Sequence, residues 1–178
     1  VFAGYPLIVY FGLTHFEPKY LGVAIALIFV LRFFSLRRKI DKEQMLGFVP
    51  LLISGVICGL IAALLNTPSY LTLIPFLMNA VFFINFAYTL IKPPSMIERF
   101  ARLTDANLPT SAVAYTRNVT IVWCMFFLLN ASIALYTAMY ESIQVWALYN
   151  GLIAYAMVGL LFAVEYAVRM IIRRRSAE

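Results

Sequence analysis

The sequence contains very few of the residues from which metal centres and hydrolytic active sites are built. Among 178 residues there is one histidine, His15, and there are two cysteines, Cys58 and Cys124. One histidine cannot supply a His-based zinc site, and a serine–histidine–acid triad would have to recruit His15 from a predicted loop. GxGxxG, GKS/T and GxSxG motifs do not occur. We therefore expect no catalytic, metal-ligating or cofactor-binding residue, and we expect both cysteines to pack as small apolar side chains.

Charged residues are also scarce, at 12% of the chain, whereas hydrophobic residues make up 63%. The mean hydropathy is +0.89. A soluble domain of this length cannot bury so much apolar side chain. The composition therefore predicts an all-α membrane protein, a polytopic helical bundle in which residues 1–178 form one transmembrane domain.

Long apolar runs mark the expected membrane-spanning helices. Crossing a hydrocarbon layer of about 30 Å takes roughly 20 helical residues. Five segments meet or approach that length, and a sixth is expected to be a short or truncated first span. The six expected spans are 1–14, 20–36, 46–65, 70–91, 119–139 and 145–172.

Lysine and arginine alternate between the connections of these segments. They crowd the second and fourth connections and the end of the chain, whereas HFEPK, NTPSY and YESIQ hold one lysine between them. This positive-inside pattern predicts six crossings with both termini in the cytoplasm. Because the basic residues lie at helix ends, a nucleic-acid partner is not expected. They are Arg32, Arg37, Arg38, Lys39, Lys42, Lys92, Arg99, Arg102, Arg117, Arg169, Arg173, Arg174 and Arg175.

The connection at 92–118 contains the run KPPSMIERFARLTDANLP. Pro93 and Pro94 end the preceding helix, and Ser95 with Glu98 has the spacing of a capping box, which predicts a new helix over 95–103. Met96, Ile97, Phe100 and Leu103 share one face, so the helix is amphipathic and is expected to lie flat at the lipid headgroups on the cytoplasmic side. It is either a tethered linker or a docking platform. Its expected partner or headgroup surface is Glu98, Arg99, Phe100 and Arg102.

A family resemblance adds a location. The run PPSMIERFARLTDANLP, followed by YTRNVTIVWCMFFLLNASIALYTA and WALYNGLIAYAMVGLLFAVEYAVR, resembles a family of largely uncharacterised bacterial inner-membrane proteins that are often encoded beside fatty-acid-synthase-like or aryl-polyene pigment genes. The layout is more distantly similar to the YciB-like intracellular septation proteins. The resemblance covers most of the chain and is strongest from Lys92 to Arg169. It implies the bacterial cytoplasmic membrane and envelope lipid or acyl-chain biogenesis, and it implies no reaction.

Polar residues inside membrane spans are the default candidates for function. Glu165 and Arg169 lie four apart in the last span and are expected to pair. The pair is either an interfacial anchor or part of a polar niche that faces lipid or acyl headgroups. The residues of the expected niche are Arg117, Asn118, Asn130, Glu165 and Arg169.

Four asparagines are the other polar candidates. Their commonest use in a membrane is hydrogen bonding between helices, and the two that we expect to line a cavity, if any does, are Asn130 and Asn85. Gly55 and Gly59 have the spacing that permits close helix approach. Trp146 and Tyr149 belong to a group of aromatics expected at the outer membrane interface. The four asparagines are Asn79, Asn85, Asn130 and Asn150.

Three functions from different classes fit these features. The first is a non-enzymatic membrane component that supports envelope lipid or polyene-lipid assembly by recruiting acidic acyl-carrier or acyltransferase proteins to the basic surface. The second is a small-molecule or lipid binding or transport module, because the layout matches that of the substrate-binding subunits of vitamin importers. The third, an enzyme that acts on lipid, is least supported by the residue set. The sequence leaves the ligand and the oligomeric state, including a homo-oligomer, open.

Overall fold

The computed structural model describes residues 5–37, 42–67, 69–102 and 108–175, except the side chains of 5, 36–37, 42–51, 54 and 173–175. Every regular element in these ranges is helical, which confirms the predicted all-α class. A π-helix, η1, separates α8 from α9. The elements are α1 (Tyr5–His15), α2 (Pro18–Arg37), α3 (Lys42–Leu65), α4 (Ser69–Thr72), α5 (Ile74–Ile91), α6 (Met96–Arg102), α7 (Thr110–Tyr140), α8 (Ile143–Leu148), η1 (Tyr149–Ile153) and α9 (Ala154–Arg175).

Four described segments are long and apolar enough to cross a membrane, namely Pro18–Ser35, Ser69–Ile91, Thr110–Tyr140 and Ile143–Ile172. They support the expectation of a membrane protein. Six crossings stay a prediction, because α1 has 11 residues and the described apolar stretch of α3 is limited to Gly55–Leu65. The expected span 70–91 is interrupted near Leu73, since Pro75 starts a new helix, α5, after the short α4.

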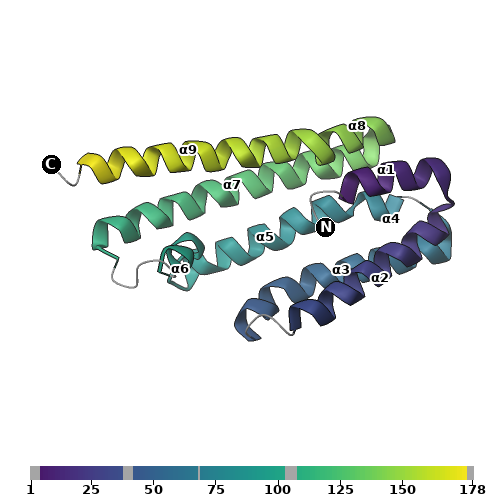
Figure 1. Ribbon diagram of the computed structural model, residues 1–178, viewed down its shortest axis with the longest axis horizontal. Helices are drawn as coiled ribbons and strands as arrows, with labels where there is room; N and C mark the ends of the chain where they lie inside the picture. The colour runs from purple at the N-terminus through teal and green to yellow at the C-terminus, as the bar shows by residue number, and fades with distance from the viewer. Residues whose placement is uncertain (1–4, 38–41, 68, 103–107, 176–178) are drawn as a thin grey trace.

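Three long rods lie side by side along the longest axis of the molecule (Figure 1). They are α5, α7 and the continuous α8–η1–α9 segment. The α2–α3 hairpin meets them where α1, α4 and α8 gather, which we call the α8 end. The opposite end carries α6 and the end of α9, and we call it the α6 end. The segment that contains Ser95 and the end of the last helix therefore lie at the same end, as the positive-inside pattern predicts.

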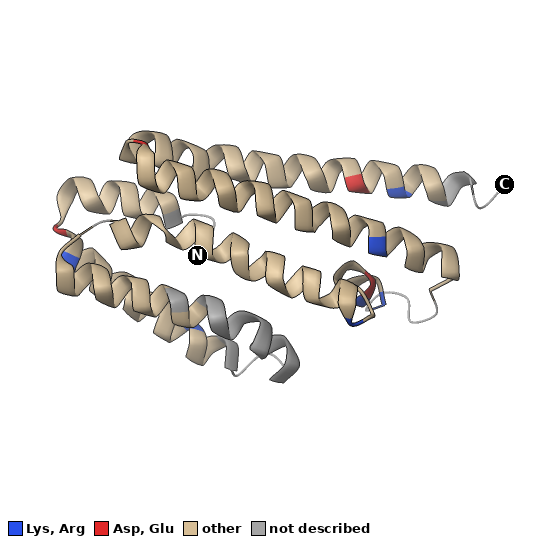
Figure 2. Cartoon of the chain, turned by 180° about the vertical axis from the view of Figure 1, so that it is seen from behind, with Lys and Arg blue, Asp and Glu red and all other residues tan. Residues whose placement is uncertain are grey.

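Charged residues gather towards the two ends of the bundle (Figure 2). The 18 residues of α5 carry no charge at all, and α7 carries only Arg117, close to the α6 end. At the α8 end, Lys19 forms an ion pair with Glu17 at 2.7 Å. The uncharged stretch between the ends matches the apolar band that a helix needs for burial in hydrocarbon.

Helices α2 and α3 form a tight hairpin through small residues. A Cβ atom on Gly59 would lie 2.8 Å from the Gly22 carbonyl oxygen, and one on Gly55 would overlap the Phe29 ring. Both glycines of the predicted close-approach pair therefore face α2, which confirms that prediction. Asn66 follows α3 with a φ of 50°, and its side-chain oxygen accepts a hydrogen bond from the Lys19 amide at 3.0 Å. This bond ties the end of α3 to the start of α2.

The apolar core lies around the α8 end. Trp146, 1% exposed, is its largest fully buried side chain. Its indole N–H donates to the Thr72 carbonyl oxygen at 2.9 Å, beside the break between α4 and α5. Trp146 and Tyr149 do not face lipid, as predicted interfacial aromatics would, because both side chains are buried and hydrogen-bonded to other helices. The core residues are Val9, Leu21, Ile25, Phe29, Leu52, Cys58, Ala62, Leu71, Ile74, Trp146 and Ala147.

Candidate functional site

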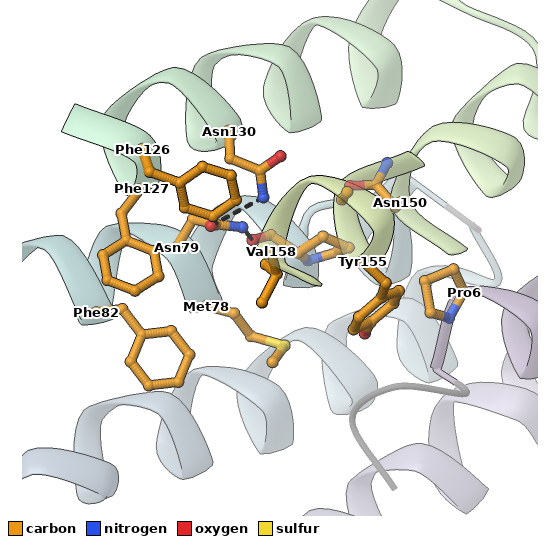
Figure 3. Close-up of a pocket in the computed structure, with 12 residues that line it drawn as sticks. Pro6, Met78, Asn79, Phe82, Phe126, Phe127, Asn130, Asn150, Tyr155 and Val158 are labelled. Atoms are coloured by element: carbon orange, nitrogen blue, oxygen red, sulfur yellow. Dashed lines mark hydrogen bonds between the residues drawn. The ribbon is translucent and has the colours of Figure 1, made fainter. Parts of the chain in front are cut away.

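A chain of polar side chains joins three helices inside the bundle. Asn130 of α7 donates from its side-chain amide to Oδ1 of Asn79 of α5 at 3.0 Å. Figure 3 shows this bond. Asn79 in turn donates to the Pro75 carbonyl oxygen at 2.8 Å. Asn130 is 5% exposed and lies about 15 Å from the Tyr140 end of α7 at 1.5 Å per residue. The amides are thus at a depth where they need protein partners.

The π-helix η1 supplies the third residue of this hydrogen-bonded network, Tyr149. Tyr149, its first residue, donates from its hydroxyl to Oδ1 of Asn130 at 2.7 Å. Asn150, the next residue, donates to Thr137 Oγ1 at 3.2 Å and to the Trp146 carbonyl oxygen at 2.9 Å. A π-turn inserts an extra residue into the helix and changes the phase of the residues after it, and such turns are frequent at functional sites. Here it brings two consecutive polar residues, Tyr149 and Asn150, to the inside of the bundle.

A pocket of about 130 Å³ lies beside these hydrogen-bonded side chains. Three of its lining residues carry side-chain amides, Asn79, Asn130 and Asn150, and Tyr155 adds a hydroxyl. Figure 3 shows Phe82, Phe126 and Phe127 on one side of the asparagine pair, and Tyr155 and Pro6 on the other. All twelve lining residues are described, and none of them is Asp, Glu, Lys, Arg or His. They are Pro6, Pro75, Met78, Asn79, Phe82, Phe126, Phe127, Asn130, Asn150, Ala154, Tyr155 and Val158.

The second polar centre is the start of α6, at the other end of the bundle. The Met96 amide donates to Thr89 Oγ1 of α5 at 2.9 Å, and the Ile97 amide donates to Thr120 Oγ1 of α7 at 3.2 Å. Both threonines are at most 2% exposed. The first amides of a helix have no partner within the helix itself. Side chains of two neighbouring helices supply these partners and fix α6 in place.

The predicted capping box at α6 forms only in part. The Ser95 amide donates to Glu98 Oε2 at 3.4 Å, as the box requires. The Ser95 hydroxyl is buried, and no described residue hydrogen-bonds to it. The expectation that Glu98 belongs to the outward surface is wrong. Glu98 is 6% exposed, because its carboxylate is occupied by the Ser95 amide and by Arg102 at 2.7 Å.

Arg99, Phe100 and Arg102 do form the outward side of α6. Phe100 is 55% exposed, and Arg99 is held across the helix start by a 2.9 Å bond from Nε to the Pro94 carbonyl oxygen. We call these three residues the α6 face. The order of apolar and polar sides is therefore different from the expected one, since Phe100 points outward while Glu98 points inward.

The predicted polar niche does not assemble at one place. Glu165 and Arg169 do pair, at 3.5 Å, and the Tyr115 hydroxyl donates to Glu165 at 3.3 Å. Arg117 instead donates to the Leu90 carbonyl oxygen at 3.0 Å, at the end of α5. Asn118 is exposed, and Asn130 belongs to the pocket. Positions 115 and 117 point to nearly opposite sides of α7, because successive helical residues are about 100° apart.

Of the two asparagines expected to line a cavity, Asn130 does so and Asn85 does not line this pocket. Asn85 donates to the Val81 carbonyl oxygen of its own helix at 2.8 Å. The polar residues at these sites that the sequence did not indicate include Asn79, Asn150, Tyr149, Tyr115, Thr89 and Thr120. Asn79 and Asn150 could be recognised from the sequence as amides inside expected spans. A single sequence does not show which face of each helix packs against a neighbouring helix.

Comparison with known proteins gives no relative: no protein-family model, no curated protein and no solved structure matches this chain. Among the described residues, no three His, Cys, Asp or Glu side chains gather as metal ligands would. Cys58 and Cys124 are both buried and free. What can be said of function therefore rests on the pocket and on the α6 face.

Proposed function

We propose that this chain is a non-enzymatic, multi-pass inner-membrane protein with both termini in the cytoplasm, and that it supports envelope lipid or polyene-lipid biogenesis by recruiting a cytoplasmic acyl-carrier or acyltransferase protein. One observation carries the proposal. Helix α6 is clamped by Thr89 and Thr120, so that Arg99 and Phe100 are held outward in a fixed geometry. A linker needs no such clamp, whereas a docking surface gains affinity from pre-organisation.

The α6 face suits an acidic partner. Exposed arginines attract such a protein over distance, and an exposed aromatic ring gives the contact an apolar centre. Binding of a purified acyl-carrier protein to this protein in nanodiscs tests the proposal. The test variant combines Arg99→Gln with Phe100→Ala and keeps Arg102, which neutralises the buried Glu98. We expect the dissociation constant to rise about tenfold or more, as it does when residues at the centre of an interface are truncated.

A matched control removes one positive charge and one exposed apolar side chain at the same end of the bundle. It combines Arg117→Gln with Ile91→Ala, because Ile91 is 79% exposed and neither residue belongs to α6. We expect near-native affinity for the control. Equal loss in both variants would mean that the carrier senses only total charge, and unchanged binding in the test variant would overturn the proposal.

The second candidate is a binding module for a small molecule or lipid group within the membrane. The pocket favours it, because a concave, mostly apolar site with a few convergent polar groups is the usual form of a ligand site. The two functions are compatible, since the pocket and the α6 face are built from different residues.

A further inference from the structure

Some hydrogen-bonding groups of the residues that line the pocket have no partner among the described residues, which indicates room for a ligand. An asparagine side chain has two N–H donors. Asn79 uses one of them on the Pro75 carbonyl oxygen, and Asn130 uses one on Asn79. Asn150 uses both of its donors, on Thr137 and Trp146, and no described residue donates to its Oδ1. The lining residues of the pocket thus carry two N–H donors, on Asn79 and Asn130, and one carbonyl acceptor, on Asn150, that no described residue uses.

A hydroxyl is the smallest group that answers both needs, because it donates one proton and accepts at its lone pairs. The lining also limits the charge of the occupant. No lining residue is ionic, and an ion without a partner at this depth would carry a large desolvation cost. The occupant must therefore be neutral.

The size and the walls define the rest of the molecule. A volume of about 130 Å³ is comparable to the roughly 150 Å³ cavity that accommodates benzene in another protein. Phe82, Phe126, Phe127 and Met78 offer an apolar wall. Tyr155 lines the pocket and is also 38% exposed, so its ring reaches the outer surface of the bundle. A molecule dissolved in hydrocarbon can enter past this ring.

We propose that the pocket between α5, α7, η1 and α9 binds a small neutral alcohol, with its hydroxyl on the asparagines and its apolar body among the phenylalanines. The inference rests on the second function proposed above and is independent of the α6 face. The alcohol can be free or can be the hydroxyl-bearing end of a lipid chain. Labelling with a short free alcohol tests the chemistry, and labelling with a hydroxylated long-chain lipid then distinguishes the two sources.

The probe is a diazirine derivative of hexanol, irradiated with the purified protein in nanodiscs and mapped by peptide mass spectrometry. We expect labels on Met78, Val158 or their neighbours in the lining. Excess 1-hexanol should remove most of this labelling, whereas hexanoate should not, because the carboxylate is charged. Labels spread over the exposed helix faces, or equal competition by the two compounds, would overturn the proposal on the native protein alone.

Two variants sharpen the test. Val158→Trp fills the pocket and should abolish its labelling, whereas Val164→Trp, at a position of α9 that is 51% exposed, should not. Asn150→Ala removes the free acceptor and should weaken hexanol binding about fivefold, the size of one hydrogen bond. The Arg99→Gln, Phe100→Ala variant should be labelled like the native protein. Pocket binding and carrier recruitment can therefore fail separately.

Discussion

The hydroxyl of Tyr149 donates to Oδ1 of Asn130 at 2.7 Å, and this bond connects the π-helix to α7 inside the bundle. Asn130 in turn donates a hydrogen bond to Asn79 of α5. These two bonds link α5, α7 and the α8–η1–α9 segment deep inside the bundle, away from the polar contacts that Tyr115 and Arg117 make nearer the α6 end. Polar contacts between membrane helices specify which residues face each other, since an amide turned toward lipid would be left without partners.

Removing the Tyr149 hydroxyl should therefore loosen the site. We expect Tyr149→Phe to lower the free energy of unfolding by about 1 to 2 kcal/mol, because Asn130 Oδ1 loses its donor in a buried place. Reversible unfolding in mixed micelles measures the change. Tyr136→Phe is the control, since the ring of Tyr136 is 55% exposed and keeps its contact with Tyr140 without the hydroxyl. A Tyr149→Phe protein as stable as this control would contradict the role of the bond.

The hydrogen bonds that the first amides of α6 donate to Thr89 and Thr120 predict a local effect at this helix. We expect the double substitution Thr89→Val and Thr120→Val, which keeps side-chain shape, to raise hydrogen exchange at the Met96 and Ile97 amides about fivefold, since each amide loses a cap worth about 1 kcal/mol. Thr116→Val is the matched control on α7, because this buried hydroxyl donates only to Val113 of its own helix. Unchanged exchange in the double variant would show that α6 is held by other contacts.

Much of the helix layout could be predicted because its signals are local. Pro93, Pro94 and the Ser95–Glu98 spacing define the start of α6, and the structure has that helix over Met96–Arg102. The predicted outward orientation of Glu98 was wrong, because the burial of this side chain depends on Arg102 and on the packing of α6 against α7. Whether α6 also lies at the headgroups stays a prediction.

The pocket shows the corresponding limit for intramembrane residues. Polarity and depth were enough to select Asn130, but not to choose Asn79 over Asn85 in the same helix. The facing side of a helix is set by its packing partners, and α5 carries apolar residues on every side, so its pattern does not single out one asparagine. The π-turn at Tyr149 adds a phase change that no periodic pattern contains. Tyr149 therefore looked like one more interfacial aromatic.

The α2–α3 contact predicts a steric effect at Gly59. A Cβ there would meet the Gly22 carbonyl oxygen at 2.8 Å and the Ala26 amide nitrogen at 3.0 Å, both of them backbone atoms. We expect Gly59→Ala to lower the free energy of unfolding by about 1 to 3 kcal/mol through overpacking. Gly159→Ala is the control, because a Cβ at that site would meet no atom of another helix within 4 Å. The control should be neutral or slightly stabilising, since alanine favours helix more than glycine does. Equal effects of the two substitutions would contradict the close approach.

The arrangement of the two bundle ends predicts membrane topology. Phe100 of α6 and Gln144 of α8 are both exposed and lie at opposite ends. In a background with Cys58→Ala and Cys124→Ala, we expect a cysteine replacing Phe100 to react with a membrane-impermeant maleimide only in inverted vesicles, and one replacing Gln144 to react in intact spheroplasts. The reason is the excess of exposed arginine at the α6 end over the ion-paired Lys19 at the α8 end. Labelling of both cysteines from one side would mean that the long rods do not cross the membrane, and the reverse result would place α6 outside the cell, where it could not meet a cytoplasmic carrier.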